Sequence, residues 1–526
     1  MEMFRSEKIR SYVEDLMSLH HVPGLAIAVV QGDEIASEGY GKASIEPPVA
    51  CTSDTLFDFA SCAKSLTAAS VGLLVNDNEL VNDNEQLPDV QYDVLMSTLL
   101  PDDFVMSGVG YTEGVTVEDV LSHRTGMAAH DNSYFGPQAA QPDDARSITR
   151  NLRNLPVAAP IRARYLYCNM MYTVASYLVE VKSRQSFAEF LHERFFQPLD
   201  MKSTTLQPKT ARAKGLGDRI ATGYHWYKDS STYHGFQSPD CPEGQGAGSI
   251  ISSVADFAKW VQALMNRKGP INEKVYQGLI RIRSFVNPNA RRLKPHCSPA
   301  TYAAGLEVHY YRGHMVVGHN GTIDGFGSRF FFVPSFNFGA VIVGNSTGAG
   351  PIGTILARDL IDEVLQIPEA DRPYRQRSRT PKMSKNCNKN VHPKKKFGDK
   401  GNTKGEDKEK MPGTRDIPAK DLQLQDLPLN LYTGKYWHPG YHNITVQPKG
   451  DKLFIDAMDR SMGFTLTFDH LCDQTKYTAH LSDFLEDGVE SIQAEFKFEN
   501  GIAVRLGLGL EPALKEMIWF TRVDQS

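Results

Sequence analysis

A serine and a lysine stand three residues apart in the stretch "FDFASCAKSLTAASVGLL", residues 57–74. The pattern predicts a strand end followed by a buried helix over 61–75, with Ser61 at its start and Lys64 one turn in on the same face. The helix dipole and burial both lower the pKa of a lysine there. A neutral lysine can take the proton of a neighbouring serine, and the serine's own N–H can serve as an oxyanion donor. The pair indicates an activated nucleophile, although a Ser-x-x-Lys pair also arises by chance in a chain this long.

Two further stretches carry polar side chains that suit the same chemistry. In "YLYCNMMY", Tyr167 could relay protons beside a lysine, and the amide of Asn169 could orient a substrate carbonyl. In "GHNGTIDGFGSRF", His319 and Gly321 lie on a candidate strand, where a glycine lets a substrate backbone approach closely. The N–H of Thr322 could then be a second oxyanion donor. Each stretch alone is equally typical of a buried tyrosine or of a strand with a turn.

Taken together and in this order, "SCAK", "YCN" and "HNG" resemble the motifs of the serine β-lactamase-like family. That family includes class C β-lactamases, D-alanyl-D-alanine carboxypeptidases, D-aminopeptidases and related esterases and transesterases. Supporting stretches include "VPGLAIAVVQGDEI", "VTVEDVLSHRTGM" and "GAGSIISSVADFAKWVQALM", so the resemblance covers roughly residues 8–366. It implies a β-lactamase/transpeptidase-like fold with an antiparallel sheet and a helical subdomain.

The resemblance implies that Ser61 is the nucleophile and forms an acyl-enzyme. Lys64 and Tyr167 would share the general-base and general-acid work, and which of them takes the first proton is left open. No metal or cofactor is expected.

The resemblance also assigns substrate contacts. Asn169 would hold a substrate amide or ester group, the N–H groups of Ser61 and Thr322 would form the oxyanion hole, and Gly321 completes the third motif. His319 would replace a lysine that contacts a substrate carboxylate. A histidine with a pKa of about 6.5 is mostly neutral at pH 7. This substitution favours an esterase, amidase, aminopeptidase or acyl-transfer role over a true β-lactamase.

The elements that must position these residues follow from hydrophobic periodicity and turn residues. An amphipathic helix is expected near the N-terminus, and "GLAIAVVQGDEIASEGYG" predicts a β-hairpin. The remaining predicted elements are a short helix at 116–122, helices within 169–197, a helix at 254–266, several antiparallel strands over 306–345 and a helix at about 353–366. Strands at both ends with helices between them indicate an α+β fold with one antiparallel sheet and a helical insert.

The chain of 526 residues is long enough for two or three domains. We assign 1–368 to the β-lactamase-like serine hydrolase domain. The segment from Arg372 to Lys410 is rich in Lys and Arg and poor in large apolar residues, and we assign 369–427 to a basic disordered linker. Residues 428–526 show six or more short strands, typical of a small antiparallel barrel or sandwich. This tail resembles the lipocalin-like β-domain often appended to these enzymes.

Charge and cysteine usage narrow the setting. The net charge of −5 gives no argument for a nucleic-acid or membrane partner, and no apolar run approaches the length of a membrane span. The N-terminus lacks the apolar core and cleavage site of a secretory signal. The seven cysteines are scattered without a CxxC pair, which suits free thiols. We therefore expect a cytoplasmic protein whose partner is a small-molecule ester or amide or a peptide substrate, and the sequence leaves a homo-oligomer open.

The leading hypothesis is a serine hydrolase that acts through an acyl-enzyme on an ester or amide of a small molecule or D-amino-acyl peptide. One alternative is an acyltransferase or transesterase of a biosynthetic pathway that uses the same Ser-Lys-Tyr site. The other is a non-catalytic scaffold that retains the fold. The sequence leaves the substrate open, and the loops 130–160 and 224–245 are expected to shape its pocket.

Overall fold

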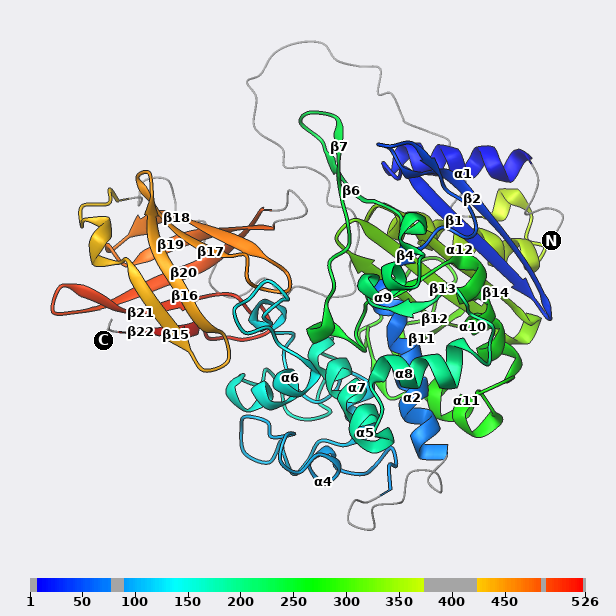
Figure 1. Ribbon diagram of the computed structural model, residues 1–526, viewed down its shortest axis with the longest axis horizontal. Coiled ribbons are helices and arrows are strands. Elements are labelled where there is room, and N and C mark those ends of the chain that lie inside the picture. The colour runs from blue at the N-terminus through cyan, green and yellow to red at the C-terminus, as the bar shows by residue number, and fades with distance from the viewer. Residues whose placement is uncertain (1–6, 77–88, 373–422, 484–488, 524–526) are drawn as a thin grey trace.

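The computed structural model describes residues 7–76, 89–372, 423–483 and 489–523 (Figure 1). Most of the predicted basic linker, residues 373–422, therefore lies outside the described residues. Within the described ranges, no helix combines the length and the apolar character that crossing a membrane requires.

A nine-stranded sheet forms the centre of the N-terminal part, and all its neighbouring strands are antiparallel. In spatial order the strands are β3 (Val49–Ala50), β2 (Glu34–Ser44), β1 (Gly24–Gln31), β14 (Phe338–Gly344), β13 (Phe326–Val333), β12 (His314–Ile323), β11 (Glu307–Tyr311), β10 (Thr301–Tyr302) and β9 (Ser284–Phe285). The first strands of the chain thus lie beside the last strand of this part. The predicted hairpin and the predicted strands of 306–345 are confirmed.

Helices cover both faces of this sheet, as the alternation along β1 shows. Ile27 and Val29 belong to a core shared with α1 (Glu7–Leu19) and α12 (Ala349–Val364). Ala26 and Ala28 point to the opposite face and belong to the larger core, which includes residues of α10 (Val254–Asn266). Successive side chains of a strand point to opposite faces, so a strand covered on both sides is apolar along its whole length. The predicted α+β fold is confirmed.

A helical subdomain packs beside the sheet around α2 (Lys64–Asn76). Every residue of α2 from Lys64 to Val75 is buried, as expected for a helix that is apolar on all sides and surrounded by others. Its neighbours include α7 and α11. The other helices of this subdomain are α4 (Met96–Leu99), α5 (Val117–Leu121), α6 (Ala145–Asn151), α7 (Asn169–Ser183), α8 (Phe187–Leu191) and α11 (Glu273–Ile280).

The start of α2 differs from the prediction. Ser61 lies in a 3₁₀ turn, η2 (Ala60–Ala63), and Lys64 is the first α-helical residue rather than one turn in. Ala60 has φ of 45°, and its N–H donates to Asp58 Oδ1 at 2.7 Å. The chain therefore turns sharply before the helix, and the tighter 3₁₀ geometry accommodates that turn.

Other helix boundaries depend on local chemistry. The short helix α5 begins with a capping box, in which the N–H of Thr116 donates to Asp119 Oδ2 at 3.0 Å. The helix α12 begins at Ala349, earlier than predicted, because Pro351 falls in its first turn, where a missing N–H has no helical partner to lose. The predicted helical region 169–197 is divided after α7.

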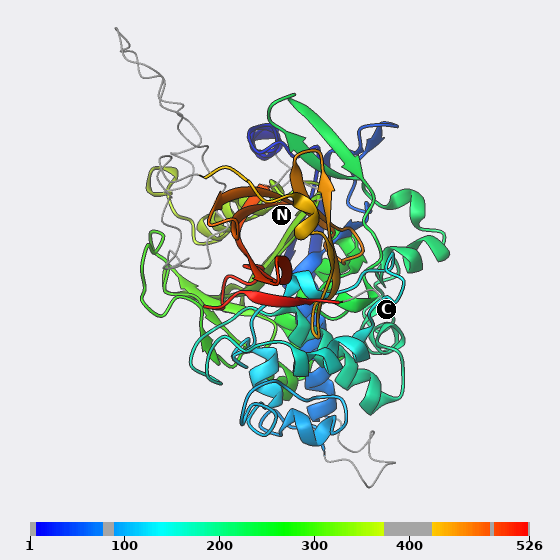
Figure 2. The ribbon, with the colours of Figure 1, turned by 90° about the vertical axis from the view of Figure 1, so that its left-hand side faces the viewer.

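The C-terminal part is a closed barrel in which each strand pairs with the next and the last pairs with the first (Figure 2). Its strands are β15 (Gly434–His438), β16 (His442–Lys449), β17 (Lys452–Ala457), β18 (Phe464–Cys472), β19 (Lys476–Asp483), β20 (Val489–Glu499), β21 (Ile502–Leu508) and β22 (Ile518–Arg522). Buried residues alternate with others, as with Ile444 and Val446 in β16. Of the two predicted architectures, the barrel is the one observed.

Candidate active site

The turn that carries Ser61 is fixed from both sides. The strand β4 (Phe57–Asp58) pairs with β8 (Ile250–Ser252), and the N–H of Phe59 donates to the carbonyl of Ile250 at 2.9 Å. From the other side β12 approaches so closely that a Cβ on Gly321 would lie 2.4 Å from the carbonyl oxygen of Phe59. Gly321 of the third motif is therefore required because β12 passes close to the turn that carries Ser61. The sequence suggested instead that this glycine gives room to a substrate.

Lys64 is fully buried, and its side-chain nitrogen has three hydrogen-bond partners. Nζ lies 3.0 Å from Ser61 Oγ, 2.8 Å from Asn169 Oδ1 and 2.8 Å from the carbonyl oxygen of Ala247. The first two contacts bring together residues of the predicted site that stand more than a hundred positions apart in the chain. The carbonyl of Ala247 was not foreseen.

Burial lowers the pKa of Lys64 to about 7, although the negative charge of Asp131 opposes the shift. A neutral amine has two hydrogens and one lone pair. The oxygens of Asn169 and Ala247 can only accept, so they take the two hydrogens. In this neutral form the remaining lone pair faces the hydroxyl of Ser61, whereas the charged form donates to the same oxygen; the neutral arrangement suits a lysine that accepts a proton.

Tyr167 approaches Ser61 from a second direction. Its hydroxyl donates to Ser61 Oγ at 2.8 Å, and its ring centroid lies 4.8 Å from Lys64 Nζ. Burial raises the pKa of Tyr167 well above the ordinary value, which keeps the phenol neutral and able to donate. The serine oxygen therefore sits between one proton acceptor and one proton donor.

Asn169 connects this group to a carboxylate that the sequence analysis did not single out. Its Nδ2 donates to Asp131 Oδ1 at 3.2 Å, while its Oδ1 accepts from Lys64. A carboxylate can only accept, so Asp131 fixes which end of the amide faces the lysine. Burial raises the pKa of Asp131 to about 6. Asp131 lies within the predicted pocket loop 130–160, but no motif or spacing pointed to it.

His319 is only 4% exposed, and both of its ring nitrogens have partners. Nδ1 lies 2.5 Å from the carbonyl oxygen of Asn320, which requires a hydrogen on Nδ1, so Nε2 accepts from the hydroxyl of Tyr302 at 2.8 Å. Burial, and then the charge of Lys64, lower the pKa of His319 to about 3. The ring is neutral at pH 7, as expected, and Thr322 lies exposed further along the same strand.

His123 supports Tyr167 from behind. It is fully buried, its Nδ1 accepts the N–H of Cys168 at 3.1 Å, and its ring centroid lies 4.3 Å from that of Tyr167. The N–H of Leu166 donates to the carbonyl of His123 at 2.8 Å. The segment before Tyr167 is thereby tied to the turn that follows α5.

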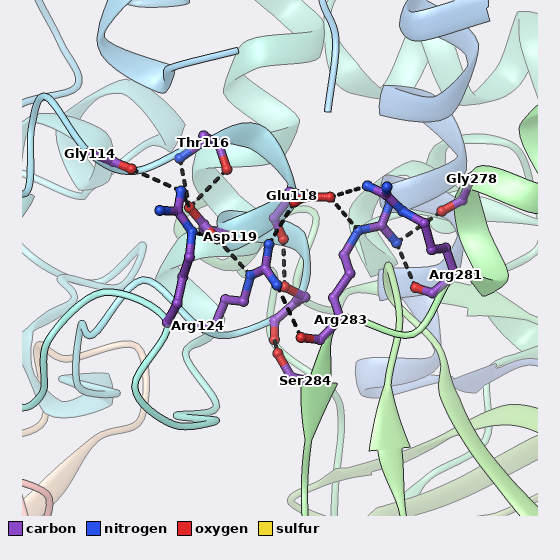
Figure 3. A network of polar contacts seen from close by, with 11 residues as sticks. Gly114, Thr116, Glu118, Asp119, Arg124, Gly278, Arg281, Arg283 and Ser284 are labelled. Carbon is purple, nitrogen blue, oxygen red and sulfur yellow. Dashed lines mark hydrogen bonds and ion pairs between the residues drawn. The ribbon is translucent and has the colours of Figure 1, made fainter. Parts of the chain in front are cut away.

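A network of charged side chains fixes that turn in place (Figure 3). Asp119 is fully buried and accepts from Arg124 Nε at 2.6 Å and from Arg162 at 2.9 and 2.5 Å. Glu118 pairs with Arg124 at 2.7 Å and with Arg283 at 3.1 Å. The network joins α5, the segment before Tyr167 and Arg283, the residue before the strand β9.

Comparisons with known proteins identify the family of this chain. The model of the Beta-lactamase family matches residues 9–364, and a model described as a domain of unknown function, DUF3471, matches residues 419–522. The unguisins hydrolase ungD' of Aspergillus campestris is 32% identical, covering 97% of this chain and 90% of that protein. The unguisins hydrolase ungD of Aspergillus violaceofuscus is also 32% identical, covering 97% and 89%.

Two solved structures share the fold. The octameric penicillin-binding protein homologue from Pyrococcus abyssi superposes with a TM-score of 0.58 at 18% identity and covers 98% of this chain and 99% of that one. The D-amino acid amidase from Ochrobactrum anthropi SV3 gives a TM-score of 0.51 at 20% identity, covering 68% of this chain and 98% of that one.

Proposed function

Because the chain belongs to the beta-lactamase family and is a serine hydrolase, we propose that it cleaves an ester or amide through an acyl-enzyme on Ser61. The substrate class is a small molecule or a D-amino-acyl peptide. The observation that carries the proposal is the position of Ser61 Oγ, 3.0 Å from the amine of Lys64 and 2.8 Å from the hydroxyl of Tyr167. A serine placed in this way can lose its proton as it attacks.

The hydrogen-bond pattern favours Lys64 as the group that takes the first proton. Its lone pair faces Ser61, whereas Tyr167 donates to the same oxygen. Ser61 Oγ attacks the carbonyl carbon and its proton passes to Lys64. Tyr167 then gives its phenolic proton to the departing oxygen or nitrogen and regains one from the lysine. Water attacks the acyl-enzyme with the same groups in reverse.

The N–H groups of Ser61 and Thr322 are proposed to bind the oxyanion, and Asn169 to contact the substrate amide or ester. The state of His319 favours a substrate that has no carboxylate next to this residue. The ring is neutral, and both of its nitrogens are hydrogen-bonded within the protein. The names of two similar proteins, unguisins hydrolase and D-amino acid amidase, agree with hydrolysis and, for the second, with an amide substrate.

The transesterase alternative uses the same residues with an alcohol or amine in place of water, and the hydrolase names of the relatives favour water. A non-catalytic scaffold is disfavoured because it has no need for a buried lysine bonded to a serine. Assembly into a homo-oligomer stays a proposal, and the octamer of the Pyrococcus abyssi protein is in line with it.

The test compares wild type with Ser61→Ala. Both are treated with a fluorophosphonate probe and analysed by intact mass, and both are assayed with p-nitrophenyl acetate, p-nitrophenyl butyrate and nitrocefin. We expect one covalent adduct and ester turnover in wild type only, with little nitrocefin turnover. Equal labelling and turnover in the two proteins would contradict the proposal.

A further inference from the structure

The barrel contacts the hydrolase part directly at His130, the residue before Asp131. Glu511, which lies between β21 and β22, accepts the N–H of His130 at 2.8 Å. The imidazole Nε2 lies 2.9 Å from the carbonyl of Pro156 and must carry a hydrogen, so Nδ1 accepts from the hydroxyl of Tyr441 at 2.8 Å. The backbone N–H and both ring nitrogens of His130 thus have hydrogen-bond partners, and two of these partners, Glu511 and Tyr441, belong to the barrel.

His130 has a backbone conformation that needs such support. Its φ is 50°, in the left-handed region that a residue with a side chain rarely adopts. The 3₁₀ turn η3 (Asp131–Ser133) begins immediately after it. The orientation of the Asp131 side chain therefore depends on the backbone conformation of His130.

A second contact fixes the other end of this segment. The N–H of Gly136 donates to the carbonyl of Asp459, and the N–H of Ser461 donates to the carbonyl of Tyr134, both at 3.0 Å. Arg460, only 4% exposed, lies over the ring of Phe135, with its guanidinium carbon 4.0 Å from the ring centroid. The barrel thus contacts the segment 130–136 at both of its ends.

From Asp131 the contacts lead to the nucleophile. Asp131 accepts from the amide nitrogen of Asn169, whose oxygen accepts from Lys64, whose nitrogen lies beside Ser61. If Asn169 turned its NH₂ group toward Lys64, two donors would face each other. The carboxylate of Asp131 opposes that flip.

We propose that the C-terminal barrel is a positioning element of the active site, in which Tyr441 and Glu511 hold His130 and thereby orient the Asp131–Asn169–Lys64 series. The inference rests on the proposed function in one respect, since it takes Lys64 as the base that receives the proton of Ser61. Tyr441 and Glu511 touch neither substrate nor reacting atoms and act through His130.

The charges around Asp131 supply a readout that loss of packing alone does not move. Lys64 and Glu511 both interact electrostatically with Asp131, and the hydroxyl of Tyr134 donates to it at 3.4 Å. Because the charge of Asp131 raises the pKa of Lys64, its removal moves the titration of Lys64 to lower pH.

The experiment measures the second-order rate constant of fluorophosphonate labelling from acid to alkaline pH in the full-length protein. The variants are Tyr441→Phe, Glu511→Gln and Asp131→Asn, and the matched control is Tyr477→Phe. The hydroxyl of Tyr477 donates to Gln425 within the C-terminal part at 2.6 Å, away from His130. Circular dichroism and a thermal melt establish that each variant is folded.

We expect Tyr441→Phe to slow labelling about fivefold and Glu511→Gln about twofold, since each removes or weakens one hydrogen bond. Asp131→Asn should slow labelling and move the midpoint of its pH dependence about half a unit to lower pH. Tyr441→Phe and Glu511→Gln should move the midpoint in the same direction by less, since a displaced Asp131 raises the pKa of Lys64 less. Tyr477→Phe should label at the wild-type rate.

If Tyr441→Phe and Glu511→Gln label like wild type with the same midpoint, the barrel does not position the site and the inference is wrong, even if both melt at lower temperature. The proposed function would survive that result. If Tyr441→Phe does not fold, Glu511→Gln decides. A wild type that takes no label overturns the proposed function, and this inference with it.

Discussion

Two regions of the protein each bury an ionisable side chain, one with oppositely charged partners and the other with uncharged partners. Asp119 is fully buried and receives hydrogen bonds from two guanidinium groups, those of Arg124 and Arg162. Lys64 is equally buried, but its hydrogen-bond partners are a hydroxyl, an amide oxygen and a backbone carbonyl. No carboxylate lies within hydrogen-bond distance of it among the residues that the structure describes.

The difference teaches how partners decide what a buried ionisable group does. An ion with full counter-charges keeps its charge and holds elements together, and removing one partner strands the other. A buried lysine without a counter-ion gives up its proton near neutral pH and becomes a base. The first arrangement fixes the turn behind Tyr167 and the second performs the chemistry proposed for Ser61.

The largest expected effect comes from removing the amine of Lys64, the buried group without a counter-ion. Lys64→Met fills a similar volume without a proton acceptor, so the rate of fluorophosphonate labelling should fall about 10²- to 10⁴-fold. The free energy of unfolding should stay level or rise, since a buried amine no longer needs to be accommodated. Labelling kinetics and urea unfolding measure the two quantities.

Lys182→Met is the matched control, because Lys182 is a second lysine of low exposure in the same subdomain, at 8%. Its labelling rate should equal that of wild type. A Lys64→Met enzyme that still labels at the wild-type rate would show that Lys64 is not the base.

Replacing Asp119, the buried group with charged partners, should lower the free energy of unfolding. Asp119→Asn keeps the shape of the side chain but removes the carboxylate that Arg124 and Arg162 share, so that Arg124 pairs with Glu118 and no longer with two carboxylates. We expect the free energy of unfolding to fall by about 3 kcal/mol, at the low end for a buried pair, because Arg162 is half exposed and can hydrate. Urea unfolding of the variant measures this change.

The control for that change is Asp33→Asn, since Asp33 pairs with Lys268 at an exposed surface. Its unfolding free energy should be nearly unchanged. If Asp119→Asn unfolds at the same urea concentration as wild type, the charged network does not stabilise the turn behind Tyr167.

The smallest expected effect, at most about 1.4 kcal/mol per pH unit, is the pH dependence of stability that Lys64 causes. Its pKa is about 7 in the folded protein and near the ordinary value of about 10.5 when unfolded, so between these values the unfolded chain binds the extra proton. Stability should therefore rise with pH over this window, and the advantage of Lys64→Met over wild type should shrink. An advantage that is constant from neutral to alkaline pH would contradict a neutral lysine.

Much of the site was accessible from the sequence because its motifs are short and local. Ser61 and Lys64 share one turn, and Tyr167 and Asn169 flank a single cysteine, so type and spacing were enough to pick them out. Their mutual contacts, including the 2.8 Å bond between Lys64 and Asn169, agree with that choice of residues. The roles assigned to them stay proposals.

What the sequence did not give depends on long-range contacts or on local strain. Asp131 meets Asn169 across 38 positions with no pattern between them, and Ala247 contributes only a backbone carbonyl, which any residue has. The 3₁₀ turn at Ser61 follows from the left-handed backbone of Ala60, a residue that rarely adopts it. Closure of the barrel likewise rests on the pairing of β15 with β22, which alternation cannot reveal.

The most direct test of the central claim is the pH dependence of wild-type labelling, with the adduct located by peptide mapping. Since the neutral form of Lys64 prevails above its pKa of about 7, the rate should rise about tenfold per pH unit below that value and level off above it. The label should sit on Ser61. A rate that does not change from acid to alkaline pH, or a label on another residue, would contradict the account.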